Sequence, residues 1–193
     1  RLSREAGIDT QHVLVIPSAP TSTYLSVLDH AGKMQVAIAD MSIIDQLNVE
    51  FLKTQQPMLS QSALIVIDTN LATDTMAWLT SSFSSTPIFA DTVSTAKALR
   101  LKPHLSCIHT LKTGTLEVEA LTGLSARTQK QLNHVADQLH DDGVDRVFIT
   151  RGEKGVFYSS HNDRGTQSLN RNNRKIHNVG GAGDAFLAAL AYS

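Results

Sequence analysis

The chain reads Asn178-Val179-Gly180-Gly181-Ala182-Gly183-Asp184-Ala185-Phe186 near its C-terminal end and continues as Leu187-Ala188-Ala189-Leu190. A glycine turn here leads directly into an apolar helix whose first turn carries a carboxylate, Asp184. Free backbone N–H groups at the start of a helix attract anionic oxygens, and glycine lets the backbone approach them closely. Asp184 is placed to accept a proton from an attacking hydroxyl. The stretch therefore points to phosphoryl transfer.

Composition and charge narrow the class of protein. The chain has 193 residues, of which 41% are hydrophobic and 18% charged, and this suits one domain with a core and a small appendage. The net charge of -1 and the lack of a basic run argue against a nucleic-acid partner. A single cysteine, Cys107, excludes an intrachain disulfide and fits a reducing compartment. Because we find no membrane-length apolar run and no signal peptide, we expect a cytoplasmic protein without a membrane partner.

Both ends of the sequence have the pattern of truncated segments. The start lacks Met and reads like the end of a helix that reaches Gly7, and the last residues up to Ser193 stop inside an apolar helical pattern. We therefore expect that elements that complete the fold are missing.

From residue 63 onward, short β-branched runs that end in polar residues or glycine alternate with helical patterns. The expected strands are Ala63–Ile67, Pro87–Ala90, Ile108–Leu111, Arg146–Thr150 and Gly155–Tyr158, the last paired by a hairpin with the strand before it. The expected helices are Thr73–Phe83, Thr92–Leu99, Leu116–Thr122 and Thr128–Asp142. This alternation predicts an α/β fold with a mostly parallel sheet covered by helices on both faces. Ligands of such sheets gather at the C-terminal ends of the strands.

The first part of the chain has a different pattern. Val13–Ile16, Thr23–Leu28 and Met34–Ile38 are strand-like without helices between them, and Asp29–Lys33 has the composition of a hairpin turn. We expect a small antiparallel β lid over residues 10–41, attached to an α/β core formed by residues 1–9 and 42–193. The alternatives are an edge extension of the sheet or a dimer surface.

Further polar positions follow the predicted strands. Thr150-Arg151-Gly152-Glu153-Lys154-Gly155 is a second glycine loop, which together with the first could bracket the phosphates of a nucleotide. The alternative for Gly152 and Gly155 is a plain β-turn. Asp68 and Asp91 end strands, so they either cap the following helices or line the pocket.

The order of these features resembles the ribokinase-like (PfkB-type) carbohydrate and nucleoside kinases. Their signature is a Thr-Gly-Ala-Gly-Asp turn that opens a helix, a Ser/Thr-x-Gly-x-x-Gly loop before it, a Lys-Pro-Asn-x-x-Glu segment further upstream, and a small β lid near the N-terminus. Within the family the chain is most similar to the pseudouridine kinases. The segments that carry this finer resemblance are Pro20–Asp29, Val36–Met41, Phe89–Ser94, His109–Lys112 and Asn178-Val179.

The resemblance spans essentially the whole chain and implies a role for each matching residue. Asp184 resembles the base that deprotonates the acceptor hydroxyl. Gly181, Ala182 and Gly183 resemble the anion hole, whose N–H groups stabilise charge on the transferred phosphoryl group. The implied activity is ATP-dependent phosphorylation of the ribose 5′-hydroxyl of pseudouridine.

The same resemblance implies ligands for ATP, Mg²⁺ and the nucleoside or sugar substrate. Lys112, Thr150, Gly152 and Gly155 match positions beside ATP, and Glu117 matches the acidic residue that organises Mg²⁺ through water. Ser22 and Tyr24 lie on the lid-like segment and are expected to contact the base or ribose of the substrate. The lid is also a surface through which members of the family form homodimers.

Three positions depart from the family pattern. Gly114 stands where Asn is usual, Thr113 where Pro is usual, and Gly180 where Thr is usual. The losses at Gly114 and Gly180 remove polar groups beside the expected active centre. These losses leave a nucleoside-binding pseudokinase open as an alternative. Independently of them, a ribokinase-like kinase for another sugar or nucleoside also stays open.

Overall fold

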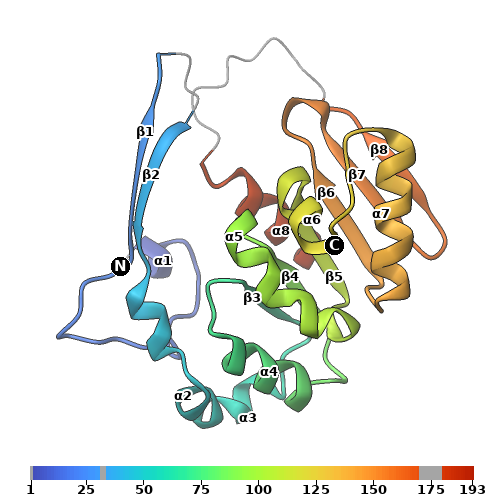
Figure 1. Ribbon diagram of the computed structural model, residues 1–193. Coiled ribbons are helices and arrows are strands. Elements are labelled where there is room, and N and C mark those ends of the chain that lie inside the picture. Colours follow the sequence, from blue (N-terminus) through green and yellow to red (C-terminus); the bar gives the residue numbers. More distant parts are fainter. Residues whose placement is uncertain (1, 31–33, 170–179) are drawn as a thin grey trace.

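The computed structural model describes residues 2–30, 34–169 and 180–193 and contains a six-stranded sheet in the order β3-β4-β5-β6-β7-β8 (Figure 1). The strands are β3 (Ile65–Asp68), β4 (Ile88–Asp91), β5 (Thr110–Gly114), β6 (Arg146–Thr150), β7 (Val156–Ser160) and β8 (Arg164–Gln167). Strands β3 to β6 pair in parallel, whereas β7 and β8 add to the sheet as antiparallel hairpins. The predicted mostly parallel sheet and the hairpin after β6 are confirmed.

Helices connect the parallel strands: α4 (Thr73–Ser82), α5 (Thr95–Ala98), η2 (Leu99–Cys107), α6 (Thr115–Thr122) and α7 (Gln129–Asp141). The short η3 (Gly152–Lys154) lies between β6 and β7, and α8 (Ala182–Tyr192) follows β8 in the sequence. The predicted helices match α4, α6 and α7 within one or two residues. The helix predicted at Thr92–Leu99 is shorter, because the backbone first turns at Val93 with a φ of 54° and afterwards tightens into the 3-10 helix η2.

The two faces of the sheet are covered by different helices. Val147 and Ile149 of β6 are fully buried and share one hydrophobic cluster with Leu132 and Leu139 of α7. Phe148 points to the opposite face, because side chains alternate along a strand, and its ring contacts that of Phe186 in α8 with centroids 5.8 Å apart. The predicted covering on both faces is therefore confirmed.

The N-terminal part forms a separate two-stranded antiparallel sheet of β1 (Thr23–Leu28) and β2 (Met34–Asp40) (Figure 1). It is followed by η1 (Ser42–Gln46), α2 (Val49–Thr54) and α3 (Gln56–Leu59), and α1 (Leu2–Glu5) precedes it. Two of the three strands predicted here are confirmed. Residues 31–33 of the predicted turn lie outside the described residues.

The strand predicted at Val13–Ile16 is wrong. This segment lies between turns, with the Val13 N–H bonded to the Thr10 carbonyl at 3.2 Å and the Ala19 N–H bonded to the Ile16 carbonyl at 3.2 Å. Pro17 lacks the N–H group that a strand ladder needs. The apolar run therefore stays exposed instead of pairing, with Val15 76% exposed.

Within residues 2–30, 34–169 and 180–193, every helix is too short or too polar to cross a membrane.

His104 is a buried polar residue between η2 and α4. Its side chain is close to Thr80 of α4, with 3.4 Å between the imidazole Nδ1 and the threonine Oγ1. Its other ring nitrogen, Nε2, is buried and has no hydrogen-bond partner among the described residues. Burial lowers the pKa of His104 below its ordinary value, because the charged imidazolium is poorly solvated there.

We predict that His104→Leu reduces the loss in the free energy of unfolding between pH 7.5 and pH 5.5. The unfolded chain takes up a proton at His104 below a pH of about 6.5, whereas the folded protein resists it until the pH falls through the lowered pKa. The contribution to the free energy of unfolding is therefore present above that range and lost as the pH falls. The substitution also removes the unsatisfied Nε2 atom, so we expect a gain of about 1 kcal/mol at pH 7.5. Urea unfolding at pH 7.5 and pH 5.5 measures both effects.

The matched control is His134→Leu, which removes an exposed histidine from α7. It should retain the pH dependence of the unmodified protein. A His104→Leu variant that loses as much stability between the two pH values as the control would show that His104 does not carry the effect.

Candidate functional site

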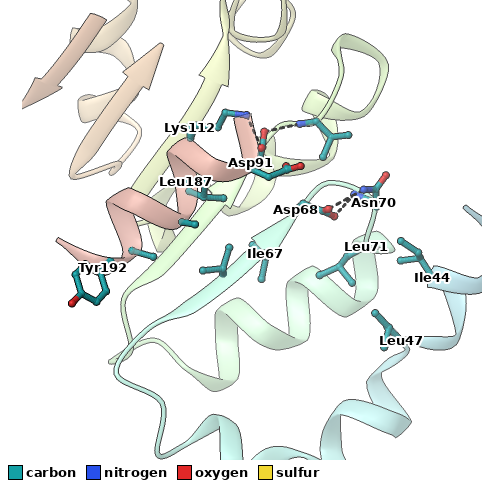
Figure 2. Close-up of a pocket in the computed structure, with 15 residues that line it drawn as sticks. Ile44, Leu47, Ile67, Asp68, Asn70, Leu71, Asp91, Lys112, Leu187 and Tyr192 are labelled. Carbon is teal, nitrogen blue, oxygen red and sulfur yellow. Dashed lines mark hydrogen bonds and ion pairs between the residues drawn. The ribbon is translucent and has the colours of Figure 1, made fainter. Parts of the chain in front are cut away.

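A cleft of about 1010 Å³ lies at the carboxyl ends of β3, β4 and β5, where the strand–helix alternation predicts a ligand site (Figure 2). One part of its wall is apolar. It comes from η1 and its C-cap, from the segment after β3, and from α8, with the side chains of Ile44, Leu47, Leu71, Leu187, Ala188 and Ala191. The polar part contains Asp68, Asn70, Asp91, Lys112 and Asp184. The cleft thus joins an apolar wall to a cluster of carboxylates and one ammonium group.

The glycine turn forms the start of α8, as predicted. Gly181 is the N-cap with a φ of 75°, a left-handed conformation that favours glycine, and the Ala185 N–H bonds to the Gly181 carbonyl at 2.9 Å. The N–H groups of Ala182, Gly183 and Asp184 therefore belong to the first turn, which has no carbonyl within the helix to bond to. Asp184 is the third residue of α8, is exposed, and lines the cleft. Asn178 and Val179 lie outside the described residues.

Asp91 and Lys112 form a buried ion pair at the polar end of the cleft. They are partners in the parallel register of β4 and β5, and the Lys112 Nζ atom lies 2.6 Å from the Asp91 Oδ2 atom (Figure 2). The Lys112 side chain is only 11% exposed and the Asp91 side chain only 9%. A buried charge requires a partner of opposite sign, and each residue supplies it for the other.

The same ammonium group lies against the glycine turn. A Cβ atom placed at Gly183 would be 2.6 Å from the Lys112 Nζ atom, closer than such contacts allow. Glycine at this position therefore lets the first turn of α8 approach the ammonium group. The structure thus brings together three of the predicted site residues, Lys112, Gly183 and Asp184.

Asp68 and Asn70 form a second polar group at the end of β3. The Asp68 carboxylate accepts hydrogen bonds from the Asn70 N–H and side-chain amide, both at 2.8 Å, and Lys97 donates to the Asn70 side-chain oxygen at 2.6 Å. Helix α4 has Ala72 as its N-cap and α5 has Ser94, so neither Asp68 nor Asp91 occupies a capping position. Of the two alternatives for these aspartates, lining of the pocket is confirmed.

Glu117, Gly114 and Thr150 lie together at the ends of β5 and β6. Gly114 and Thr150 are partners in the parallel register, and the Thr150 hydroxyl donates to the Thr113 carbonyl at 3.2 Å. The Glu117 carboxylate, in the first turn of α6, folds over Gly114 and occupies the space that a side chain there would need. The missing side chain at position 114 is thus what lets Glu117 take this position.

The Glu117 carboxylate is a suitable ligand for Mg²⁺ only together with ligands from outside the protein. The described part of the chain contains no group of three or more His, Cys, Asp or Glu residues that could hold a metal ion alone. Mg²⁺ prefers oxygen ligands, keeps several waters, and is commonly bound by one or two carboxylates together with substrate phosphates. Glu117 therefore fits an ion held mainly by a phosphate ligand and water.

The second glycine loop is a tight turn between β6 and β7. The Arg151 N–H bonds to the Gly155 carbonyl at 2.8 Å, and Gly152 and Gly155 have φ values of 57° and 86°. A side chain at Gly155 would overlap the Gln167 carbonyl of β8. Packing against β8 is thus enough to require glycine at 155, and a contact of Thr150, Gly152 or Gly155 with ATP stays a prediction.

The predicted substrate residues lie outside the cleft. Tyr24 belongs to β1, Ser22 precedes that strand, and neither is among the described residues that line the cleft. Their contact with a substrate also stays a prediction.

Asn70 and Val93 are among the lining residues that were assigned no role from the sequence. Asn70 lies three residues after the predicted strand Ala63–Ile67, so its position was a usable signal. Val93 gave none, because a β-branched residue rarely adopts a φ of 54°.

Comparison with known proteins adds an independent result. A model of the pfkB family carbohydrate kinases matches residues 1–193. The chain is 34% identical over 190 residues to the pseudouridine kinase of Escherichia coli, covering 98% of this chain and 60% of that protein. It is 30% identical over 191 residues to the uncharacterized sugar kinase YeiI of Escherichia coli, covering 99% and 52%. The chain therefore spans less than two thirds of the length of either relative.

A solved structure shows the same fold. The ribokinase from Giardia lamblia superposes with a TM-score of 0.79 at 15% identity, over 98% of this chain and 60% of that one. This likeness shows that the fold is ribokinase-like.

We predict that the buried ion pair is far more important for stability than a surface pair. Lys112→Met should lower the free energy of unfolding by about 3–5 kcal/mol, because it leaves the Asp91 carboxylate buried without a counter-charge. The double variant Asp91→Leu with Lys112→Met should recover most of this loss, because both charges are then absent. Urea unfolding gives the three values.

Arg127→Met is the control, because Arg127 is 76% exposed in its pair with Glu119 and should cost at most about 1 kcal/mol. An equally small loss for Lys112→Met would contradict the importance of the buried pair.

Proposed function

The chain belongs to the pfkB family of carbohydrate kinases, and on that premise we propose that the full-length protein transfers the γ-phosphoryl group of ATP to a hydroxyl group of a nucleoside or sugar. The substrate that we propose is pseudouridine, phosphorylated at its ribose 5′-hydroxyl. The observation that carries the proposal is the placement of Asp184 in the first turn of α8, at the cleft that Lys112 also lines.

The geometry supports separate roles for the residues of the cleft in phosphoryl transfer. Asp184 accepts the proton of the acceptor hydroxyl while the acceptor oxygen attacks the γ-phosphorus in line. The first-turn N–H groups of Ala182 and Gly183 and the Lys112 ammonium face negative charge on the transferred group. The apolar wall of the cleft supports exclusion of water from the reacting atoms.

Glu117 is the residue that we propose to hold Mg²⁺ through water, at the ends of β5 and β6. When bound, the ion neutralises charge on the phosphates of ATP. Glu117 orients the water ligands, and its own orientation depends on the space left open at Gly114. Thr150 and Gly152 are proposed to lie beside the nucleotide.

Pseudouridine is proposed as the acceptor because this chain is 34% identical over 190 residues to the pseudouridine kinase of Escherichia coli. The alternative acceptor is another sugar or nucleoside, favoured by the 30% identity to a sugar kinase. Ser22 and Tyr24 are proposed to contact the base or ribose. The single cysteine favours the cytoplasm as the compartment.

A pseudokinase that binds a nucleoside without turnover is the second candidate, suggested by Gly114 and Gly180. The position of Glu117 argues for the kinase instead. An Asn side chain at position 114 would collide with the Glu117 carboxylate in its present position. The amide that the family usually has at 114 is thus absent, and the Glu117 carboxylate occupies its space.

We predict that the full-length protein phosphorylates pseudouridine with ATP and that Asp184→Asn lowers kcat by about 10²–10⁴-fold. The amide cannot take the hydroxyl proton, whereas it keeps the shape of the side chain, so binding of pseudouridine should change little. ADP release in a coupled assay measures turnover, and calorimetry measures binding. Ribose and inosine are assayed in parallel.

Asp142→Asn, at the C-terminal end of α7, is the matched control and should retain full activity. Turnover of ribose or inosine without turnover of pseudouridine would replace the proposed acceptor by the alternative one. Binding of pseudouridine without any turnover would establish the pseudokinase, and full activity of Asp184→Asn would refute the role of the base.

We also propose that the two-stranded sheet serves as a lid and as a homodimer surface. The cross-strand pairs Leu25–Ile38 and Val27–Val36 lie on one face, and all four side chains are more than half exposed, between 52% and 63%. Such a contiguous apolar face is typical of an interaction surface. Tyr24 lies on the opposite face, because side chains alternate along β1.

We predict that the unmodified protein sediments as a dimer and that Ile38→Glu converts it into a monomer, because a carboxylate on the apolar face cannot be buried unpaired. Analytical ultracentrifugation measures the change. Ser26→Glu places the same charge on the opposite face and should leave the dimer intact. A monomeric unmodified protein, or equal effects of both variants, would refute the dimer surface.

A further inference from the structure

The Asp91 carboxylate has two partners, one on each side of it. Its Oδ2 atom lies 2.6 Å from the Lys112 Nζ atom, and its Oδ1 atom accepts a hydrogen bond from the Val93 N–H at 3.0 Å. We infer that Asp91 is a positioning residue, which holds the Lys112 ammonium beneath the glycine turn so that it meets the transferred phosphoryl group. This inference rests on the proposed function.

The position of the ammonium group explains why it needs an anchor. Lys112 lies against Gly183, in the first turn of α8, where the helix dipole already has its positive end. A cation is unfavourable there unless a carboxylate compensates its charge. A lysine side chain is also a flexible four-carbon stem, which lets the ammonium group turn away. Asp91 supplies both the compensating charge and the fixed direction.

The anchor leaves the ammonium group able to act. A lysine ammonium has three N–H donors, and Asp91 occupies one of them. The remaining donors can point to the phosphate oxygens that the first-turn N–H groups also face. Asp184, which also lines the cleft, is exposed and can take the proton of the acceptor.

The backbone around Asp91 fixes the carboxylate in turn. Val93 has a φ of 54°, which is strained for a β-branched residue, and the Ser94 N–H bonds back to the Thr92 carbonyl across it. The Thr92 hydroxyl donates to the Thr113 hydroxyl of β5 at 2.9 Å, and the Thr69 hydroxyl of the segment after β3 donates to the Thr92 carbonyl at 2.6 Å. Strain of this kind persists only where neighbouring contacts enforce it. The strained turn brings the Val93 N–H to the Asp91 Oδ1 atom and so helps to fix the carboxylate.

The reaction balances without a change at Asp91 or Lys112. The acceptor oxygen forms a bond to the γ-phosphorus, and the bond from that phosphorus to the bridging oxygen of ADP breaks. The acceptor proton moves to Asp184, whereas Lys112 keeps its protons and Asp91 stays a carboxylate.

The test is a double-mutant cycle in the full-length protein, with Asp91→Asn, Lys112→Gln and the two combined. We expect each single variant to lower kcat by about 10–100-fold, with the KM for pseudouridine changed by less than about threefold. Because Asp91 acts through Lys112, Asp91→Asn should change kcat by less than about twofold once Lys112→Gln is present. Multiplied effects in the double variant, or a change confined to KM, would overturn the inference.

A second variant covers the case in which Asp91→Asn does not fold, as judged by circular dichroism. Asp91→Glu keeps the charge and moves the carboxylate by one methylene, so kcat should fall about tenfold while the fold is retained. An unchanged kcat for Asp91→Glu would overturn the inference. The matched control is Asp137→Glu. Asp137 lies on α7 and forms an ion pair with Arg164 of β8, so its replacement should leave kcat unchanged.

The two hypotheses fail in different ways. An unmodified protein that transfers no phosphoryl group to pseudouridine, ribose or inosine would overturn the proposed function and this inference with it. An active unmodified protein with independent effects of Asp91 and Lys112 would overturn this inference alone.

Discussion

The parallel register of β4 and β5 places Asp91 directly beside Lys112, and the rest of the site depends on this pairing. Strand β4 is buried at all four positions, so a carboxylate at its end needs a counter-charge that the neighbouring strand can supply. Once the pair forms, the ammonium group is fixed at the carboxyl edge of the sheet. Glycine at position 183 then leaves room for the first turn of α8 to lie against the ammonium group where the ion pair holds it. One ion pair thus links two strands of the sheet to a helix that packs on the opposite face from α7.

The location of the cleft follows from the same topology. Parallel strands connected by helices bring their carboxyl ends to one edge, and this edge collects the polar residues after β3, β4 and β5. Helix α8 closes one side of the cleft with Leu187. Ile44 of η1 and Leu47, which caps η1, contribute from the segment that follows the two-stranded sheet. The segment between the small sheet and the core therefore lines part of the cleft directly.

The sequence was informative where local patterns alone determine the structure. Strand β6 was predicted residue for residue, because Arg146–Thr150 alternates between the buried face and the other one. The start of α8 was equally clear from its glycines and Asp184. The Val13–Ile16 segment shows the limit of this reasoning, because a β-branched run becomes a strand only where it has a neighbour to pair with. Strand β8 was missed because Arg164–Gln167 is short and polar, and with it the reason for glycine at 155 was missed.

The candidate site was predictable in its parts and not in its pairings. Asp184 was singled out from the glycine turn, whereas Lys112 and Glu117 were named from the family resemblance, and Asp91 was left between two alternatives. Lys112, Asp184 and Asp91 line the cleft. The contact of Asp91 with Lys112 depends on a register between residues 21 positions apart, which local patterns do not determine. The helices between Ser42 and Leu59 were missed as well, because they are too short to show a periodicity of side chains.

Two carboxylates near one lysine have different surroundings, and these surroundings assign their chemistry. Asp91 is buried, and both of its oxygens are engaged, one by the Lys112 ammonium and one by the Val93 N–H. A carboxylate held in this way stabilises a neighbouring charge. Asp184 stands exposed in the first turn of α8 and lines the cleft. These surroundings favour Asp184 as the proton acceptor that we propose, and they place Asp91 in the frame that keeps Lys112 in place.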